Sequence, residues 1–66
     1  MKITVNIGKH SECRELSEIC TVKDLLKTLE IPSETVVVKK NEYVVIDEET
    51  VEDGDTIEII KVIFGG

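Results

Sequence analysis

The first residues of the chain alternate between apolar and polar side chains. The apolar positions of this alternation are Met1, Ile3, Val5 and Ile7. A period of two is typical of a strand that buries one face and exposes the other. Turn-forming residues at 8–11 and a weaker strand pattern at 12–16 follow. The sequence therefore predicts an N-terminal β-hairpin.

From residue 22 the spacing of the apolar residues changes to that of a helix. Its apolar stripe, with the spacing i, i+3, i+4 and i+7, consists of Val22, Leu25, Leu26 and Leu29. Such a stripe must pack on another layer, here a sheet. Thr21 precedes it and Asp24 follows three residues later, as in a capping box with aspartate in place of the longer glutamate. Pro32 lacks a backbone donor and disfavours helical dihedrals at Ile31, so the helix should end near Glu30.

Apolar runs and turn residues divide the second half of the chain. Two runs flank the turn at residues 41–42 and predict a second hairpin, with strands at 36–40 and 43–46. After an acidic connection, Val51 is expected to plug the core. The Asp-Gly-Asp sequence at 53–55 is a strong turn signal before the last strand.

The last strand is predicted over residues 56–63, which completes the order β-β-α-β-β-β. The sequence contains no linker, internal repeat or low-complexity segment. One helix laid across one mixed sheet is the simplest two-layer arrangement of these elements. We therefore expect a single α+β domain over residues 1–66.

This strand is apolar on both faces near its end. Ile57 and Ile59 alternate with polar residues, whereas Ile60, Val62 and Phe64 carry apolar groups in the opposite phase. One interpretation is a β-bulge, or a central strand whose outer face is covered by neighbouring aliphatic side chains. The other is an exposed apolar patch of the kind that marks protein–protein sites. In the second interpretation Ile60, Val62 and Phe64 bind a partner.

Length and charge exclude several classes of function. The chain has 66 residues and a net charge of -6. A domain of this size buries only about 60% of its unfolded surface, which leaves little room for an active-site cleft. The negative charge repels nucleic acid and anionic lipid, no apolar run approaches the ~20 residues of a membrane span, and the N-terminus lacks the apolar region of a signal peptide. We expect a cytoplasmic protein that is not an enzyme and binds neither nucleic acid nor membrane.

The residues that could bind a metal are few. Cys13, Cys20 and His10 supply too few ligands for a structural zinc site, and there is no CxxC pair. One disulfide is possible, but a cytoplasmic protein favours two free thiols. His10 is expected to lie in the solvated turn. The chain itself is thus predicted to bind no metal and no cofactor.

The sequence ends with Phe64-Gly65-Gly66. At an average glycine usage of about 7%, a glycine pair at two given positions arises by chance at roughly 0.5%. Two residues without Cβ can enter a narrow channel of another protein. Gly65 would then allow a flexible tail at 64–66 to thread, and the carboxylate of Gly66 would react. A frayed end or a cloning remnant is the alternative.

In combination, these features resemble the β-grasp ubiquitin-like sulfur carrier family (ThiS/MoaD-like, including small archaeal ubiquitin-like modifiers). The resemblance covers the whole chain: the element order, the helix stripe from Val22 to Leu29, the hairpin beginning at Val36, the turn at 53–55 and the diglycine end. The chain departs from the family at Glu42, where many relatives have glycine. The resemblance implies a β-grasp fold.

The resemblance also implies that the protein is a substrate of other enzymes. In the family, an E1-like adenylyltransferase (ThiF/MoeB-like) binds the diglycine tail and uses ATP to adenylate the terminal carboxylate, here that of Gly66. A sulfur donor enzyme then supplies the sulfur of a thiocarboxylate. The sulfur acceptor is a thiazole synthase, the large subunit of molybdopterin synthase or a tRNA thiolase, in thiamine, molybdopterin or tRNA thiolation pathways.

Two other functions remain open. If a lysine of a target protein attacked the same adenylate, the chain would be a ubiquitin-like modifier conjugated through Gly66. If no adenylating enzyme recognises the tail, the chain would be a non-catalytic β-grasp binding module with incidental glycines.

Overall fold

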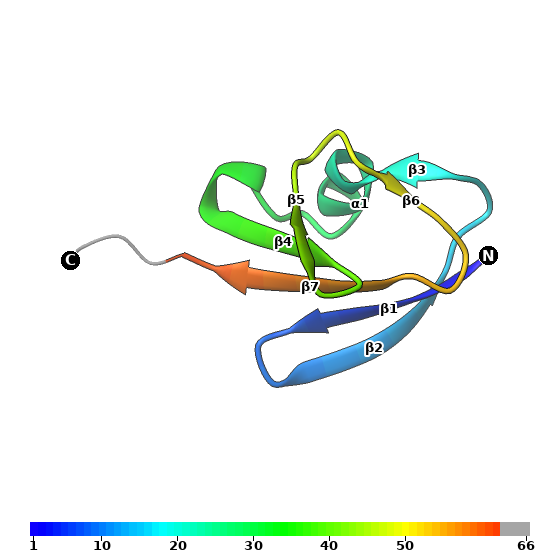
Figure 1. The fold of residues 1–66 in the computed structure, drawn as a ribbon, viewed down its shortest axis with the longest axis horizontal. Helices are drawn as coiled ribbons and strands as arrows, with labels where there is room; N and C mark the ends of the chain where they lie inside the picture. The colour runs from blue at the N-terminus through cyan, green and yellow to red at the C-terminus, as the bar shows by residue number, and fades with distance from the viewer. Residues whose placement is uncertain (63–66) are drawn as a thin grey trace.

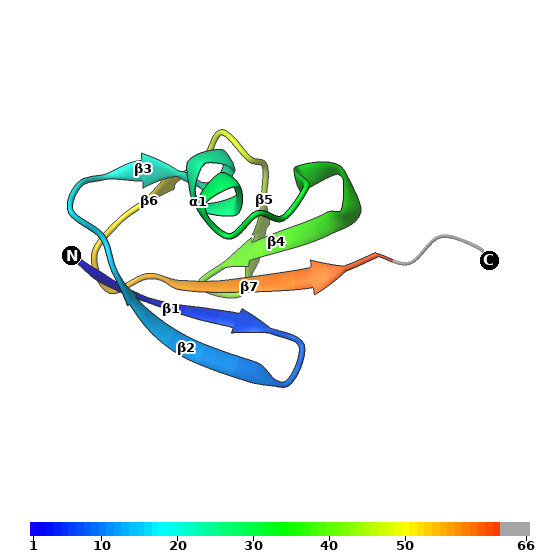
Figure 2. The same cartoon turned by 180° about the vertical axis from the view of Figure 1, so that it is seen from behind.

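The computed structural model describes residues 1–62. Its elements in chain order are β1 (Lys2–Ile7), β2 (His10–Glu15), β3 (Cys20–Thr21), α1 (Val22–Thr28), the 3-10 turn η1 (Ser33–Thr35), β4 (Val36–Lys40), β5 (Tyr43–Val45), β6 (Thr50–Val51) and β7 (Thr56–Lys61). The main sheet has five strands in the order β2-β1-β7-β4-β5, and β3 pairs with β6 in a small second sheet. Helix α1 lies across one face of the main sheet (Figures 1 and 2). The predicted α+β arrangement is confirmed.

Strand β7 occupies the middle of the main sheet. It pairs in parallel with β1, where Val5 lies opposite Ile57, and antiparallel with β4, where Val38 lies opposite Ile59. A parallel pair requires a crossover connection, and the segment between β1 and β7 carries α1 over the sheet. β7, the last strand of the described residues, is therefore paired with a neighbouring strand on each side.

The hydrophobic core lies between α1 and the inner face of the sheet. Its buried side chains are Ile3, Val5, Val22, Leu25, Leu26, Val38, Val51, Ile57 and Ile59. Leu29, the last residue of the predicted stripe, packs against this core while remaining partly exposed. Val51 is completely buried, which confirms the prediction that its side chain is part of the core.

Both ends of α1 are fixed by hydrogen bonds. The Thr21 hydroxyl accepts from the Asp24 N–H at 3.2 Å, and the Asp24 carboxylate accepts from the Thr21 N–H at 3.3 Å, which confirms the capping box. At the other end, the N–H of Ile31 donates to Leu26 O at 2.9 Å, while Glu30 has a φ of 60°. This is the bonding of a Schellman motif. It ends the helix at Thr28, earlier than Pro32 alone predicted.

The small sheet was not predicted. Its two strands contain two residues each, so they have no detectable period. Next to it, the N–H groups of Val22 and Lys23 donate to Glu49 O and Asp47 O at 2.8 Å each. The acidic connection between β5 and β6 thus supplies carbonyl acceptors for two N–H groups that the start of a helix leaves without a partner.

His10 is solvated as predicted, but its predicted place in the turn was wrong. His10 begins β2, opposite Ile7, and the connecting turn consists of Gly8 and Lys9. Gly8 has a φ of 60°, and a two-residue hairpin turn of type II′ needs such a dihedral at its first position. His10 remains exposed.

Within residues 1–62, the helix is too short to cross a membrane.

The β4–β5 turn consists of two residues with positive φ, 50° at Asn41 and 76° at Glu42. This is the pattern of a type I′ turn, which favours Asn-Gly. Asn41 is suited to its position, and its side chain accepts from the Thr56 N–H at 2.9 Å. Glu42 has a Cβ where glycine is preferred and therefore stores strain.

We predict that Glu42→Gly raises the free energy of unfolding by about 0.5–1 kcal/mol, because relief of the left-handed strain exceeds the entropic cost of a glycine. Urea denaturation measures the change. The matched control is Glu48→Gly, since Glu48 is also an exposed turn residue but does not have a positive φ. The control should not be stabilised. Equal or lower stability of Glu42→Gly than of the unaltered protein would contradict the strain.

Candidate functional site

Two of the five predicted site residues lie in the described part of the chain. Ile60 is near the end of β7 with 38% of its surface exposed, and Val62 follows the strand in a half-buried position. The N–H of Val62 donates to Thr35 O at 2.9 Å, so the backbone is fixed up to this residue. Phe64, Gly65 and Gly66, together with the predicted tail at 64–66, lie outside the described residues.

The outer face of β7, on the side away from α1, is open to solvent. Along β7, Ile57 and Ile59 are buried, while Thr56, Glu58 and Ile60 are exposed. The alternation is unbroken over this range, so the strand contains no phase-resetting bulge there. β7 is a central strand, but neighbouring side chains do not cover its outer face at Ile60, so the interpretation as a covered central strand is wrong at this residue.

Val37 is the nearest apolar neighbour of Ile60 in the sheet. It lies directly opposite Ile60 in the β4–β7 pairing and is half-buried, and opposite residues place their side chains in contact range. The sequence analysis missed this residue. The signal was present in the consecutive valines 36–38, because one of two neighbouring strand residues must face outward, but the sequence does not give the register.

A shallow hollow of about 590 Å³ lies beside the end of β7. The β1–β2 turn and β7 line it together, through Ile7, Gly8, Glu58, Ile59, Ile60 and Lys61. Its apolar walls continue the surface formed by Val37 and Ile60. The end of β7 therefore presents an apolar surface to a partner.

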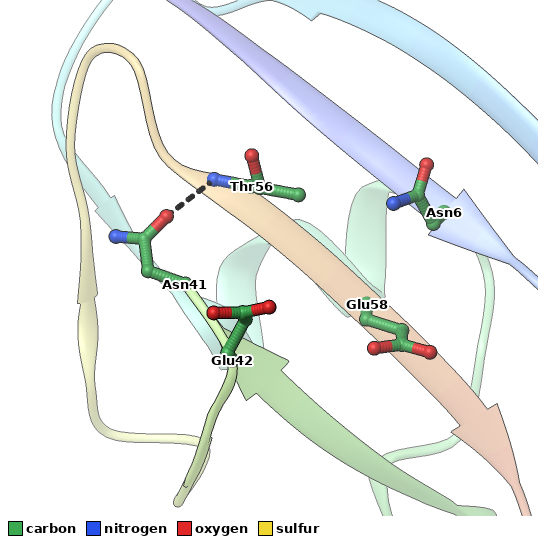
Figure 3. A pocket seen from close by; sticks show the side chains of 5 residues that line it. All are labelled: Asn6, Asn41, Glu42, Thr56 and Glu58. Carbon is green, nitrogen blue, oxygen red and sulfur yellow. Dashed lines mark hydrogen bonds between the residues drawn. The ribbon is translucent and has the colours of Figure 1, made fainter.

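A second hollow, of about 430 Å³, lies further back on the outer face. It is lined by Asn6, Asn41, Glu42, Thr56 and Glu58 (Figure 3). The Asn41 amide group is committed to the fold, because it donates to Asp55 Oδ1 at 2.9 Å and accepts from the Thr56 N–H at 2.9 Å. Glu42 and Glu58 are exposed carboxylates. This end of the outer face therefore offers negative charge.

Asp55 stabilises the turn that leads into β7. Burial would raise the pKa of its carboxyl group, but hydrogen bonds from the Glu52 N–H and the Asn41 amide outweigh burial and lower the pKa. The two hydrogen bonds measure 2.7 and 2.9 Å. Asp53 similarly accepts from the Lys2 N–H at 2.7 Å. Asp53 thus joins the turn to β1, and Asp55 joins it to the β4–β5 turn through Asn41.

Both cysteines are free thiols, as predicted, with Cys13 exposed and Cys20 half-buried. Burial raises the pKa of the Cys20 thiol, and Asp24 and Glu18 add to the effect. A thiol with a raised pKa is a poor nucleophile at neutral pH.

Over residues 1–62, no group of histidine, cysteine and carboxylate side chains could hold a metal ion.

Comparison with known proteins gives matches along almost the whole chain. A profile of the protein family described as the ThiS family matches residues 5–66. The crystal structure of the thiamine biosynthesis protein ThiS from Geobacter metallireducens has a TM-score of 0.67 and 28% sequence identity, covering 96% of this chain and 99% of that one. A ubiquitin from Caldiarchaeum subterraneum has a TM-score of 0.68 and 24% identity, covering 100% of this chain and 98% of that one. The likeness to both structures confirms the predicted β-grasp fold.

Proposed function

The chain belongs to the ThiS family, and we propose that it is the sulfur carrier protein of a thiamine biosynthesis pathway. The observation that carries this proposal is the family match, because it extends through the glycines at residues 65 and 66. The 28% identical structure over 96% of the chain is that of a thiamine biosynthesis protein, which supports the choice of pathway. The acceptor is then a thiazole synthase, and molybdopterin synthase or a tRNA thiolase is the alternative.

The reactive group in this proposal is the carboxylate of Gly66. An α-carboxylate has a pKa of about 3.5, so it is ionised at neutral pH and is a poor electrophile. An E1-like adenylyltransferase activates it: a carboxylate oxygen attacks the α-phosphorus of ATP, and pyrophosphate leaves. ATP and the groups that bind it belong to this partner.

Sulfur enters in the next steps. The terminal sulfur of a persulfide on the donor enzyme attacks the acyl carbon, and AMP leaves. The product is an acyl disulfide between Gly66 and the donor enzyme. A thiol then attacks the donor-enzyme sulfur of this acyl disulfide, which releases the thiocarboxylate of Gly66 and leaves a disulfide between the thiol and the donor enzyme. The acceptor enzyme consumes the thiocarboxylate sulfur.

The described domain supports this role by fixing the start of the tail. Val62 is bound to Thr35 through its N–H, and the four residues from there to Gly66 can span at most about 14 Å. A carboxylate on so short a connection reaches only a site close to the end of β7. The activating enzyme must therefore contact the domain itself.

We assign this contact to the apolar end of the outer face. Ile60 and Val62, with Phe64 beyond the described residues, form the docking surface that the sequence predicts, and Val37 extends it. Glu58 borders this surface and is exposed. A partner surface with apolar side chains at its centre and arginine or lysine beside them is complementary to it.

A second candidate function is that of a protein modifier, favoured by the fold that the chain shares with an archaeal ubiquitin. The activation step is the same, but a lysine amine of a target attacks the adenylate and forms an isopeptide bond. A binding module with incidental glycines would not be adenylated at all.

Our first prediction for this function concerns the tail. Deletion of Gly66, or Gly65→Val, should abolish adenylation, because the deletion moves the terminal carboxylate back by one residue to Gly65, and the valine adds a branched side chain to a tail that must enter a narrow channel. ATP–pyrophosphate exchange with the cognate adenylyltransferase measures the step. As a control, adding one alanine after Gly66 keeps every native residue but displaces the carboxylate, and it should also abolish exchange. Thermal melts should be unchanged in all three variants, and exchange at the unaltered rate in the deletion variant would refute the proposal.

The second prediction concerns the docking surface. Ile60→Ala should weaken binding to the adenylyltransferase by more than about 1 kcal/mol with little loss of stability, because its side chain is partly exposed. Its matched control is the neighbouring Ile59, which is 1% exposed. Ile59→Ala should lower the free energy of unfolding by about 2–5 kcal/mol. A large stability loss in Ile60→Ala with unchanged affinity of the folded protein would reject the docking role.

A further inference from the structure

The two edges of the main sheet differ in their chemistry. The β2 edge carries charged side chains, and Arg14 donates to the Glu12 carboxylate at 3.2 Å. Charges on an edge strand prevent the addition of another strand. The β5 edge, by contrast, has no charged residue from Tyr43 through Ile46. It is the unprotected edge of the sheet.

Most of the side chains on the β5 edge are exposed. Tyr43, Val44 and Ile46 expose 77%, 66% and 68% of their surfaces, and we call these three residues the edge patch. A hollow of about 300 Å³ lies beside Val44 and Ile46, and its other lining residues are Ser33, Val36, Val37, Val38, Val45 and Asp47. Apolar side chains of an added strand could pack there.

The backbone of β5 is open for pairing at one position. The turn at residues 41–42 makes Lys40 and Tyr43 the closing, hydrogen-bonded pair of the hairpin, so Val44, opposite Lys39, is in a non-hydrogen-bonded pair. At such a position the N–H and C=O point away from the partner strand. Within residues 1–62, no strand pairs with the outer side of β5. Val44 therefore presents a donor and an acceptor to an added strand.

Acidic residues flank the edge patch at both ends. Glu42 precedes it, and Asp47 and Glu48 follow it. Two lysines lie nearby on β4: Lys40 Nζ is 2.8 Å from the Glu49 carboxylate, and Lys39 lies between Val44 on β5 and Glu58 on β7. The flanks therefore attract positive charge.

From these observations we propose that the β5 edge binds an extended strand of a partner protein, with apolar residues in its centre and lysine or arginine at its ends. The strand pairs with Val44 and packs apolar side chains against the edge patch, which is the β-augmentation mode of recognition. A second copy of this chain does not fit. Antiparallel pairing of two β5 strands brings Glu42 of one copy toward Asp47 and Glu48 of the other, and each copy carries a net charge of -6.

The test uses the full chain and two synthetic peptides, Lys-Arg-Val-Thr-Val-Arg-Lys and its counterpart with glutamate at the four flanking positions. Amide NMR titrations and hydrogen exchange are the readouts. The basic peptide should shift the Val44 amide and slow its exchange, with an affinity at least about tenfold higher than that of the acidic peptide.

Two variants separate the edge from the rest of the surface. Val44→Pro removes the outward N–H at an edge position where proline is tolerated, so it should abolish peptide binding while the melting temperature stays close to that of the unaltered protein. Cys13→Lys, on the exposed face of β2, should leave binding unchanged. Both measurements are independent of adenylation.

Three results would overturn the proposal: equal affinity for the two peptides, shifts confined to β2 or to the end of β7, or undiminished binding by a folded Val44→Pro variant. Formation of a dimer through β5 in sedimentation experiments, with no peptide binding, would replace the partner strand by a second copy.

Discussion

The pairing of β7 with β1 on one side and β4 on the other is the interaction on which the rest of the structure depends. It gives the sheet its order and buries Ile57 and Ile59 against α1. The same strand turns Ile60 outward, opposite Val37. One segment therefore provides core residues on one face, the proposed docking surface on the other, and the fixed point from which the proposed reactive end extends.

Much of the fold could be predicted because its signals are local. The alternation in β1, the helix stripe and the capping box at Thr21 and Asp24 each depend on side chains within a few residues of one another. The helix end was predicted less well, because a non-glycine residue in the left-handed conformation, Glu30, starts the Schellman motif. Nothing in the type of that residue indicates such a conformation.

Features that depend on register could not be predicted. Pairing decides that Val37 faces Ile60, and that Val44 presents its backbone to the open edge. The small β3–β6 sheet arises where two short segments meet beside the start of α1. For the candidate site, the sequence identified Ile60 and Val62 but not Val37. The roles of Phe64, Gly65 and Gly66 are still predictions, because these residues lie outside the described part of the chain.

The central claim is that Gly66 carries sulfur, and the mass of the intact protein from its native host tests it most directly. The account predicts a fraction of the protein in which one oxygen is replaced by sulfur, with the change located at Gly66 by fragmentation. Digests of cellular proteins should then contain few lysines that carry a Gly-Gly remnant traceable to this tail. Abundant remnants of that kind, with no sulfur detectable at Gly66, would contradict the claim and identify the chain as a protein modifier.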